Sequence, residues 1–466
     1  MITATRADTG WGRFRADFQA EILARIPEHL ERLSWSAERI EAAQRRDLRR
    51  LLAHAVAYSP FHRQRLAGTD VAGIEPADLA RLPVMTKTDM MAAIGDVFTD
   101  RRLTLAGIEQ ALSATGIEPV PVLGRYMALA TGGSTGGRGV FVFDPPAKAM
   151  FILSIIRSLL AGLHAAGGIP PGGLPMAMVG AGSAVHATGA AAAETVGTDV
   201  PVRITSVPVT LPWPQIVDRL NALQPPALIG FASALARLAA EQSAGRLQIA
   251  PMVIIATSET LVPEARAEIT AAFGAPVVNS FASTEGLMGS SAPGGDVLMF
   301  NSDMCIIELV DADNRPVGPG VPSAKVLVTN LYNLAQPLIR YELADSFVRE
   351  PGATGPGHLL ARVRGRADEV FHYRGGDLHP HVLRSVMLRS PEVTDYQIAQ
   401  TPTGIKADII AASGGASTEA LRRRLADALA YGGLGQLDVT VRIAGDLPRC
   451  AGSGKLRRFI PLSRTA

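Results

Sequence analysis

The pattern of apolar and polar positions divides the chain into a helical beginning and a longer alternation of strands and helices. Residues 42–60 carry apolar side chains at helical spacing up to a Ser-Pro stop, on a face made of Leu48, Leu51, Leu52, Ala55 and Val56. Pro83 ends a second segment, and Thr88 with Asp89 is the expected cap of the next helix. Residues 1–105 are therefore predicted to form a largely helical lead-in.

From about residue 127 onward, short β-rich runs alternate with helical stretches. The strand-like runs include VFVF, PMAMVGAG, ALIGFAS, PMVIIAT and APVVNSF, each bounded by Gly, Pro or Ser. This alternation is typical of an α/β fold with mostly parallel strands flanked by helices. The later runs CIIELVDADNRPVG and SAKVLVTNLYN predict antiparallel strands with a turn at Asp313 and Asn314.

The chain is predicted to form two domains. A Pro/Gly-rich segment, PGATGPGH, interrupts the pattern at 351–358 and precedes a final helix-and-strand unit. We expect a large N-terminal α/β domain over 1–366 and a small, mobile α+β domain over 367–466.

Composition and charge exclude several classes of protein. The 466 residues include 45 Lys and Arg and 43 Asp and Glu, a net charge of +2, which provides no basic field for nucleic acid or a membrane surface. The N-terminus has no apolar signal-peptide core, and the most apolar run, 151–163, is interrupted by Arg157 and is too short to cross a bilayer. Cys305 and Cys450 are too few for a disulfide framework or a zinc site, and we expect both to be buried. These features predict a soluble, cytoplasmic protein.

Residues 131–139, TGGSTGGRG, are rich in glycine beyond the needs of a turn. The backbone N–H groups of such a loop can bind an anion, and small side chains let phosphate oxygens approach them. From composition alone, a plain flexible hairpin remains an alternative interpretation of this loop. A Walker loop is disfavoured because Arg138 and Gly139 replace its Lys-Ser/Thr pair, and a Rossmann turn at Gly180 and Gly182 lacks its third glycine.

Four further segments carry side chains suited to nucleotide chemistry. Glu285 in NSFASTEG follows a strand-like run, where a carboxylate suits Mg²⁺ on a nucleotide phosphate. Asp345 ends the extended segment PLIRYELAD, where it suits hydrogen bonds from ribose hydroxyls. Arg366 and Asp368 lie at the domain boundary, and Lys455 lies on a Gly/Ser loop from which an ammonium can reach a phosphate. Taken singly, each has a plain alternative as a helix cap, a turn residue or a solvated side chain.

Together these segments resemble the adenylate-forming superfamily of acyl-CoA synthetases and related ligases, and most of all its phenylacetate–CoA ligase branch. The Gly-rich loop is similar to the family's phosphate loop, SFASTEG to its aromatic-Gly-x-Thr-Glu motif, and TNLYNLAQPLIRYELAD to its ribose-binding segment. RGRADEVFHYRGGDLHP is similar to the hinge and SGKLRRF to the catalytic lysine motif, while YSPFHRQRL and LPVMTKTDM resemble N-terminal segments of that branch. The resemblance covers nearly the whole chain.

The resemblance implies an ATP site built from these motifs. The loop would hold the β- and γ-phosphates with Thr131, Gly133, Ser134, Thr135 and Gly136. Other parts of the nucleotide would be lined by Ser258, Glu259, Thr260, Phe281, Ala282, Ser283 and Asp345. Thr284 would lie near the α-phosphate, Glu285 would bind Mg²⁺, and Lys455 would be the catalytic lysine. Arg366 would face the ribose and α-phosphate, and Asp368 would be the hinge.

The implied reaction is adenylation of a small carboxylic acid, an aromatic one by the same resemblance, followed by transfer to a thiol such as coenzyme A. Gly230 and Phe231 lie on the segment expected to line the acid pocket. Loading of a carrier protein, amide synthesis, activation of nitrite for reaction with an aromatic amine, and a non-catalytic nucleotide-binding role stay open. The family's loop lysine is replaced by Gly137, followed by Arg138, and the segment after the hinge also departs from the family pattern. The acceptor step is therefore less well defined than adenylation.

Overall fold

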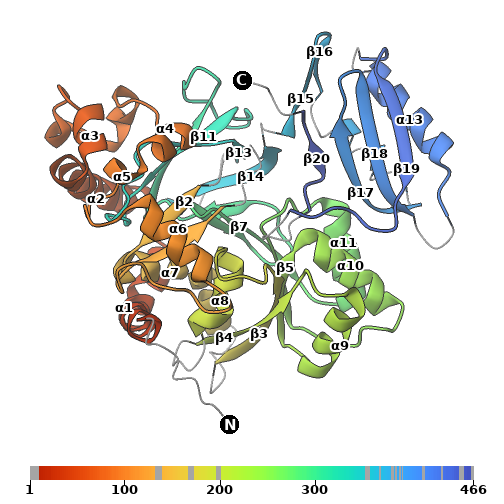
Figure 1. Ribbon diagram of the computed structural model, residues 1–466, viewed down its shortest axis with the longest axis horizontal. Coiled ribbons are helices and arrows are strands. Elements are labelled where there is room, and N and C mark those ends of the chain that lie inside the picture. Colours follow the sequence, from red (N-terminus) through yellow and green to blue (C-terminus); the bar gives the residue numbers. More distant parts are fainter. Residues whose placement is uncertain are drawn as a thin grey trace.

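The computed structural model describes residues 10–131, 139–165, 173–195, 201–351, 357–366, 369–378, 382–383, 386–387, 390, 392–411, 415–431, 434–450 and 456–462. Figure 1 shows a large body of sheets and helices, with a smaller helix-and-strand unit from the C-terminal part of the chain beside it. The predicted α/β architecture is confirmed.

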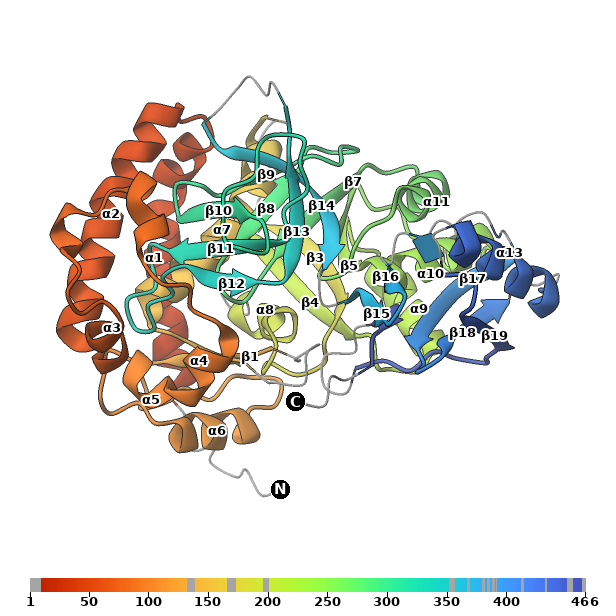
Figure 2. The ribbon, with the colours of Figure 1, turned by 90° about the horizontal axis from the view of Figure 1, so that it is seen from above.

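The first part of the large body is helical, as predicted. Its elements are α1 (Trp11–Arg32), α2 (Ala37–Tyr58), α3 (Pro60–Arg65), the 3-10 turns η1 (Val71–Gly73) and η2 (Pro76–Arg81), α4 (Lys87–Ala92), α5 (Ile94–Val97) and α6 (Leu105–Ala114). The Ser36 hydroxyl caps α2 by accepting the N–H of Arg39. The predicted apolar face of α2 is buried, because Leu48, Leu51 and Leu52 are each 0% exposed. Figure 2 shows these helices at the end of the molecule opposite the C-terminal unit.

Helix α4 begins before the predicted cap. Thr86, not Thr88, is the capping residue: its hydroxyl accepts the N–H of Asp89 at 3.1 Å, and the Asp89 carboxylate accepts the N–H of Thr86 at 3.0 Å. This reciprocal pair fixes Lys87 at the first helical position.

A nine-stranded sheet forms the centre of the described large body, in the order β13-β14-β9-β8-β7-β6-β5-β3-β4. Its strands are β3 (Leu174–Gly180), β4 (Val202–Pro208), β5 (Ala227–Phe231), β6 (Val253–Thr257), β7 (Val277–Ala282), β8 (Met288–Ser291), β9 (Leu298–Phe300), β13 (Asp345–Arg349) and β14 (Leu359–Arg366). Strands β4, β3, β5, β6 and β7 pair in parallel, and the others pair antiparallel. The parallel half places the carboxyl ends of β5, β6 and β7 at one edge, where ligands bind in open α/β sheets.

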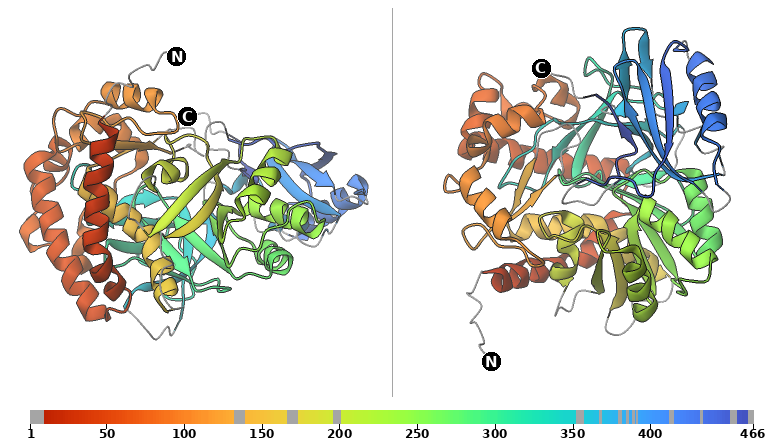
Figure 3. Two further views of the ribbon diagram at one scale, coloured as in Figure 1. Left: turned by 90° about the horizontal axis from the view of Figure 1, so that it is seen from below. Right: turned by 45° about the vertical axis from the view of Figure 1, so that its right-hand side comes forward.

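Helices cover both faces of this sheet. The helices on one face are α9 (Trp213–Leu223), α10 (Ala232–Ser243) and α11 (Pro263–Phe273), which share an apolar cluster with the strands. The helices on the other face are α7 (Pro145–Ala165) and α8 (Ala187–Thr195), and α1 packs against α7. Figure 3 shows the C-terminal unit (blue) next to the helices α9 to α11 (green).

Helix α7 is longer than the apolar run predicted from the sequence. Within the described residues, the helix segment Pro145–His164, which extends the run 151–163, is long and apolar enough to cross a membrane by length and composition. Its charged side chains are nevertheless buried in ion pairs within the protein. The Lys148 ammonium lies 2.6 Å from the Glu194 carboxylate, and the Arg157 guanidinium lies 2.6 Å from the Asp303 carboxylate. Such internal pairing is typical of a helix packed in a protein core.

Two smaller sheets complete the large body. The hairpin of β1 (Met127–Ala130) and β2 (Val140–Phe143) encloses the Gly-rich loop, whose residues 132–138 lie outside the described residues. The antiparallel sheet of β10 (Cys305–Val310), β11 (Lys325–Asn330) and β12 (Tyr341–Leu343) includes both strands predicted from this region. Asn314 adopts a φ of 66° in the turn after β10, as its side chain permits.

The C-terminal unit has its own sheet and apolar cluster. A hairpin of β15 (Phe371–Tyr373) and β16 (Gly376–Leu378) precedes a four-stranded sheet in the order β19-β18-β17-β20, against which α13 (Thr418–Tyr431) packs. The strands of this sheet are β17 (Val393–Gln400), β18 (Gly404–Ala411), β19 (Asp438–Ile443) and β20 (Phe459–Ile460). Cys305 is buried as predicted, whereas Cys450 in this unit is exposed because it follows the last long strand in an irregular segment.

Candidate functional site

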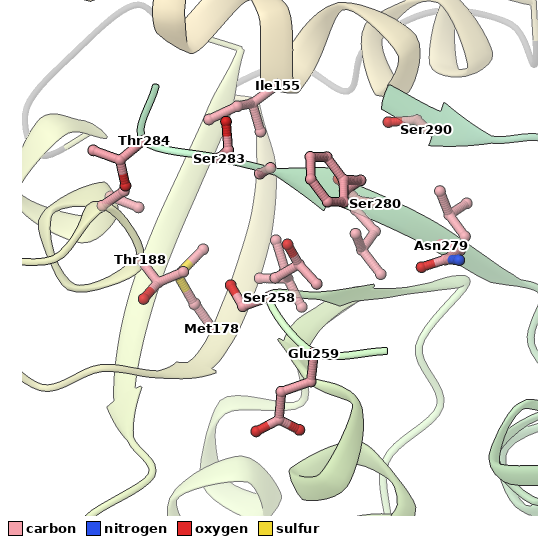
Figure 4. Close-up of a pocket in the computed structure, with 18 of the residues that line it drawn as sticks. Ile155, Met178, Thr188, Ser258, Glu259, Asn279, Ser280, Ser283, Thr284 and Ser290 are labelled. Atoms are coloured by element: carbon pink, nitrogen blue, oxygen red, sulfur yellow. The ribbon is translucent and has the colours of Figure 1, made fainter. Parts of the chain in front are cut away.

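A cavity of about 980 Å³ lies on the α7 and α8 side of the sheet and reaches the carboxyl ends of β6 and β7. Many of the predicted site residues line it: Thr131, Ser258, Glu259, Thr260, Phe281, Ala282, Ser283, Thr284, Glu285 and Asp345. Figure 4 shows the side chains of Ser258, Ser283 and Thr284 around one space, and Ile155 of α7 lies on another side of that space. Folding therefore brings residues from distant motifs to a common cavity.

Six of the predicted site residues lie outside the described residues: Gly133, Ser134, Thr135, Gly136, Asp368 and Lys455. The backbone of Arg366 pairs with that of Asp345 across β13 and β14. Leu456, directly after Lys455, and the two arginines that follow it line the cavity.

Gly230 and Phe231 are not among the described residues that line the cavity, which corrects the predicted acid pocket. Phe231 is 0% exposed and packs in the cluster between the sheet and α10. A Cβ added at Gly230 would lie 3.2 Å from the Val179 carbonyl oxygen and 3.3 Å from Leu235. The preceding residue, Ile229, lines the cavity instead, because successive residues of a strand point to opposite faces.

The base of the Gly-rich loop is held by its first and last residues. The Thr131 N–H donates to the Gly139 carbonyl at 2.9 Å, and the Gly139 N–H donates to the Thr131 hydroxyl at 3.1 Å. Lys87 is a cavity-lining cation that the sequence interpretation missed. A Cβ added at Gly139 would lie 3.5 Å from the Lys87 Cε, so this side chain lies beside the loop base. The feature of the sequence that could have indicated Lys87 is its position at the start of a helix in LPVMTKTDM.

The turn after β7 has a shape that glycine makes possible. Gly286 has a φ of +104°, and a Cβ there would collide with the Asn330 side-chain amide. The Gly286 N–H donates to the Ser283 carbonyl at 3.0 Å, and the Asn330 amide donates to the Glu285 carbonyl at 3.0 Å. These contacts fix the backbone of Thr284 and Glu285 at the cavity wall.

Glu285 places a carboxylate, on a residue that is 7% exposed, at the wall of the cavity. Burial raises the pKa of the Tyr341 hydroxyl, and the Glu285 charge raises it further. The described residues contain no group of three or more His, Cys, Asp or Glu able to hold a metal ion. The donor set fits Mg²⁺ of the kind that binds one or two carboxylates and takes its other oxygens from phosphates and water.

Phe281 and Asp345 occupy rigid positions on the strands. The Phe281 ring packs edge-on against Phe300 and Phe347, with ring centroids 5.8 Å and 5.2 Å away. Its remaining surface faces the cavity and suits stacking on a planar base. Asp345, at the start of β13, is 7% exposed and lines the same cavity.

Ser258 and Glu259, directly after β6, differ in what their side chains contact. Ser258 has a φ of 66°, a conformation that is rare outside glycine and recurs at functional sites. Figure 4 shows the Glu259 carboxylate pointing away from the other labelled side chains. It accepts the backbone N–H of Ser233 at 2.9 Å and that of Leu456 at 2.9 Å. Glu259 thus contacts the C-terminal segment rather than offering free oxygens to a nucleotide.

Comparison with known proteins supports the class of protein that this fold and site define. No family model matches the chain. The phenylacetate-coenzyme A ligase of Thermus thermophilus is 25% identical over 472 residues, covering 92% of this chain and 97% of that ligase. Protein CapK of Staphylococcus aureus is 27% identical over 192 residues, covering 40% of this chain and 41% of CapK.

Solved structures support the same fold. A 2-hydroxyisobutyryl-CoA ligase in its postadenylation state aligns with a TM-score of 0.65 and 18% identity, covering 93% of this chain and 91% of that chain. The same ligase in its thioesterification state aligns with a TM-score of 0.54 and 19% identity, covering 91% of this chain and 90% of that chain. The chain has the adenylate-forming fold, and the predicted resemblance to that superfamily is confirmed.

Proposed function

We propose that this chain is an ATP-dependent, AMP-forming ligase, which adenylates a carboxylic acid, releases pyrophosphate and transfers the acyl group to coenzyme A. The observation that carries this proposal is the single cavity shared by Ser258, Thr284, Glu285, Asp345 and the segment that follows Lys455. The acid–CoA ligases among its relatives support the same enzyme class.

In this proposal each motif holds one part of the nucleotide. The β- and γ-phosphates bind at the loop residues Thr131, Gly133, Ser134, Thr135 and Gly136. The base lies against Phe281, Ala282 and Ser283, beside Thr260 and the strained backbone of Ser258. Asp345 accepts hydrogen bonds from the ribose hydroxyls, and Arg366 faces the ribose and the α-phosphate. Glu285 would hold Mg²⁺, which would neutralise part of the phosphate charge when bound.

The chemical task of the site is to bring an anion to a polyanion. The substrate carboxylate is already a nucleophile, so its attack on the α-phosphorus needs no general base. Lys455 and Lys87 supply positive charge to the triphosphate as the carboxylate attacks the α-phosphorus and pyrophosphate leaves. The loop N–H groups and the Thr284 hydroxyl stabilise the charge that develops in the in-line transition state. Such preorganised groups commonly contribute about 10²–10³ in rate each.

The two chemical steps require two arrangements of the C-terminal unit. We propose a large domain over 1–366 and a mobile domain over 367–466 that rotates at Asp368. The separate apolar cluster of the C-terminal unit supports this division. Rotation would withdraw Lys455 after adenylation and admit the acceptor thiol. We place the enzyme in the cytoplasm, where ATP and coenzyme A are available.

Acid-dependent exchange of pyrophosphate into ATP tests the adenylation step directly. We expect exchange that requires both Mg²⁺ and a carboxylic acid. Identification of products by mass, after adding coenzyme A, a carrier protein, or nitrite with an aromatic amine, then identifies the acceptor. Nucleotide binding without exchange for any acid or nitrite would instead favour a non-catalytic relative.

A further inference from the structure

The part of the cavity away from the nucleotide motifs is an apolar chamber. Its wall on α7 is made mainly of isoleucine and leucine, with Ser158 and Gly162 between them, and its floor on β3 is made of leucine and methionine. We call it the distal chamber and define it by Ile155, Leu159, Leu163, Leu174, Met176 and Met178. Ile229 of β5 and Ile255 of β6 extend its floor.

The distal chamber begins at the reactive end of the site and runs beneath α7. Figure 4 shows Met178 near Thr188 and Ser258, at the carboxyl ends of the strands. From Met178 back to Leu174 the strand rises by about 13 Å. From Ile155 to Leu163 helix α7 rises by about 12 Å. Strand β3 and helix α7 therefore each line the chamber over a length greater than that of one aromatic ring.

The walls of the distal chamber present no unpaired charge among the described residues. Glu194 lines the cavity, but its carboxylate lies 2.6 Å from the Lys148 ammonium and both side chains are buried. Ile229 and Ile255 are each 8% exposed, although they lie on the inner face of a central sheet. Water in such a space gains few hydrogen bonds, so an apolar ligand group is favoured there.

We propose that the distal chamber binds the tail of a carboxylic acid whose apolar part extends about 12–13 Å from the reacting carboxylate. The substrate class is then long alkyl or phenylalkyl acids, beyond acids with one ring next to the carboxylate. This inference rests on the proposed adenylation of a carboxylic acid, because it assigns the acid's tail to the chamber while its carboxylate lies near Thr284.

A series of acids tests the chamber in the full-length protein. Pyrophosphate exchange is measured with straight-chain acids of increasing length and with phenylacetate and longer ω-phenylalkanoates. Each added methylene should raise kcat/KM by roughly three- to fourfold until the chamber is full. Exchange that is best with the shortest acids, or with phenylacetate, and falls with length would overturn this inference alone. Absence of exchange with every acid would overturn the proposed function as well.

Gly162 offers a way to shorten the chamber. It lies on α7 and lines the cavity, and a Cβ added there meets nothing within 4 Å. Gly162→Leu should move the optimum to shorter acids and lower kcat/KM for the longest acid at least tenfold more than for the shortest acid. His164→Leu is the matched control, because His164 is an exposed residue of the same helix and does not line the cavity. An unchanged length profile in Gly162→Leu would refute the assignment.

Leu159→Ala provides the opposite change and guards against poor folding of the first variant. Removing this side chain enlarges the chamber between α7 and the sheet. The optimum should then move to longer acids, which a purely structural role of Leu159 would not produce. A uniform loss of exchange for all lengths would count against the chamber.

Discussion

The Glu259 carboxylate accepts the backbone N–H of Leu456 at 2.9 Å. This bond links the segment after β6 in the large body to the residue that follows Lys455. The same carboxylate accepts the N–H of Ser233 at 2.9 Å, which anchors it to the start of α10. On the other side, the Arg458 carbonyl accepts the N–H of Ile398 from the small sheet at 2.7 Å. Glu259 is thus placed to hold the lysine segment against the large body.

The first prediction concerns Glu259 as a positioning residue. Glu259→Ala should lower pyrophosphate exchange by about 10- to 100-fold, because a hydrogen bond to a charged group contributes about 1.5–3 kcal/mol. Conversion of a preformed acyl-adenylate to the thioester should stay within twofold, since that step does not need Lys455 in place. Glu264→Gln, an exposed carboxylate of α11, is the control. Equal losses in both half-reactions would indicate general damage to the fold instead.

The second prediction concerns Lys455. Lys455→Ala should reduce pyrophosphate exchange by about 10²–10³-fold, because it removes a charge that acts on the transition state. ATP binding, measured by calorimetry, should change little, since the loop and Glu285 remain. Full exchange activity in this variant would remove the lysine from the mechanism.

The third prediction concerns Lys87, which lines the cavity beside Gly139. Lys87→Ala should raise the KM for ATP and lower exchange by roughly tenfold or more, because a cation near bound phosphates is lost. Lys87→Arg should recover part of the activity if charge is the essential property. Lys406→Ala, which removes a partly exposed lysine of the small sheet, serves as the control. Unchanged ATP dependence in Lys87→Ala would place the phosphates elsewhere.

Much of this site was predicted from the resemblance to the adenylate-forming superfamily, and the fold gives the physical reason. Ser258 follows β6 and Thr284 follows β7, and the parallel pairing of these strands brings their carboxyl ends to one edge of the sheet. The direction of a side chain at a strand end is harder to predict. Phe231 turns into the α10 layer, and the Glu259 carboxylate turns toward Leu456, because local packing and hydrogen bonds decide there.

Contacts between distant segments escaped the sequence interpretation for a different reason. Lys87 reaches the loop base only through the tertiary position of α4, which no local pattern encodes. Similarly, Arg157 reads as an interruption of an apolar run, yet the Asp303 carboxylate 2.6 Å away lets it stay buried within α7. The sequence pattern treats Arg157 as a break because it does not reveal the distant carboxylate that pairs with this side chain in the folded protein.

The fourth prediction concerns Gly286 in the turn that carries Glu285. Gly286→Ala should destabilise the protein by about 2 kcal/mol or more, because a φ of +104° and the collision with Asn330 both oppose a side chain. Exchange activity should fall even at temperatures where the variant is folded, since Glu285 is displaced. Gly318→Ala is the matched control, because a Cβ there meets nothing within 4 Å. Thermal unfolding that is equally affected in both variants would contradict the strain argument.

The fifth prediction concerns the pH dependence of stability through His62. This residue is 0% exposed, its Nε2 lies 3.0 Å from the Pro337 carbonyl oxygen, and burial lowers its pKa from 6.5 to about 4. The unfolded chain, with the ordinary histidine pKa, binds more protons between these values. Stability is therefore fully present above pH 6.5 and is lost as the pH falls toward 4.

Between pH 7 and pH 5 this one histidine should remove about 2 kcal/mol of stability. His62→Gln keeps a donor for the Pro337 carbonyl but does not titrate, so the variant should lose correspondingly less over the same interval. Urea unfolding midpoints at the two pH values measure the difference. His29, whose pKa burial also lowers to about 4, contributes equally to both proteins and cancels in the comparison. If His62→Gln loses as much stability as the parent protein, the proton uptake belongs to other groups.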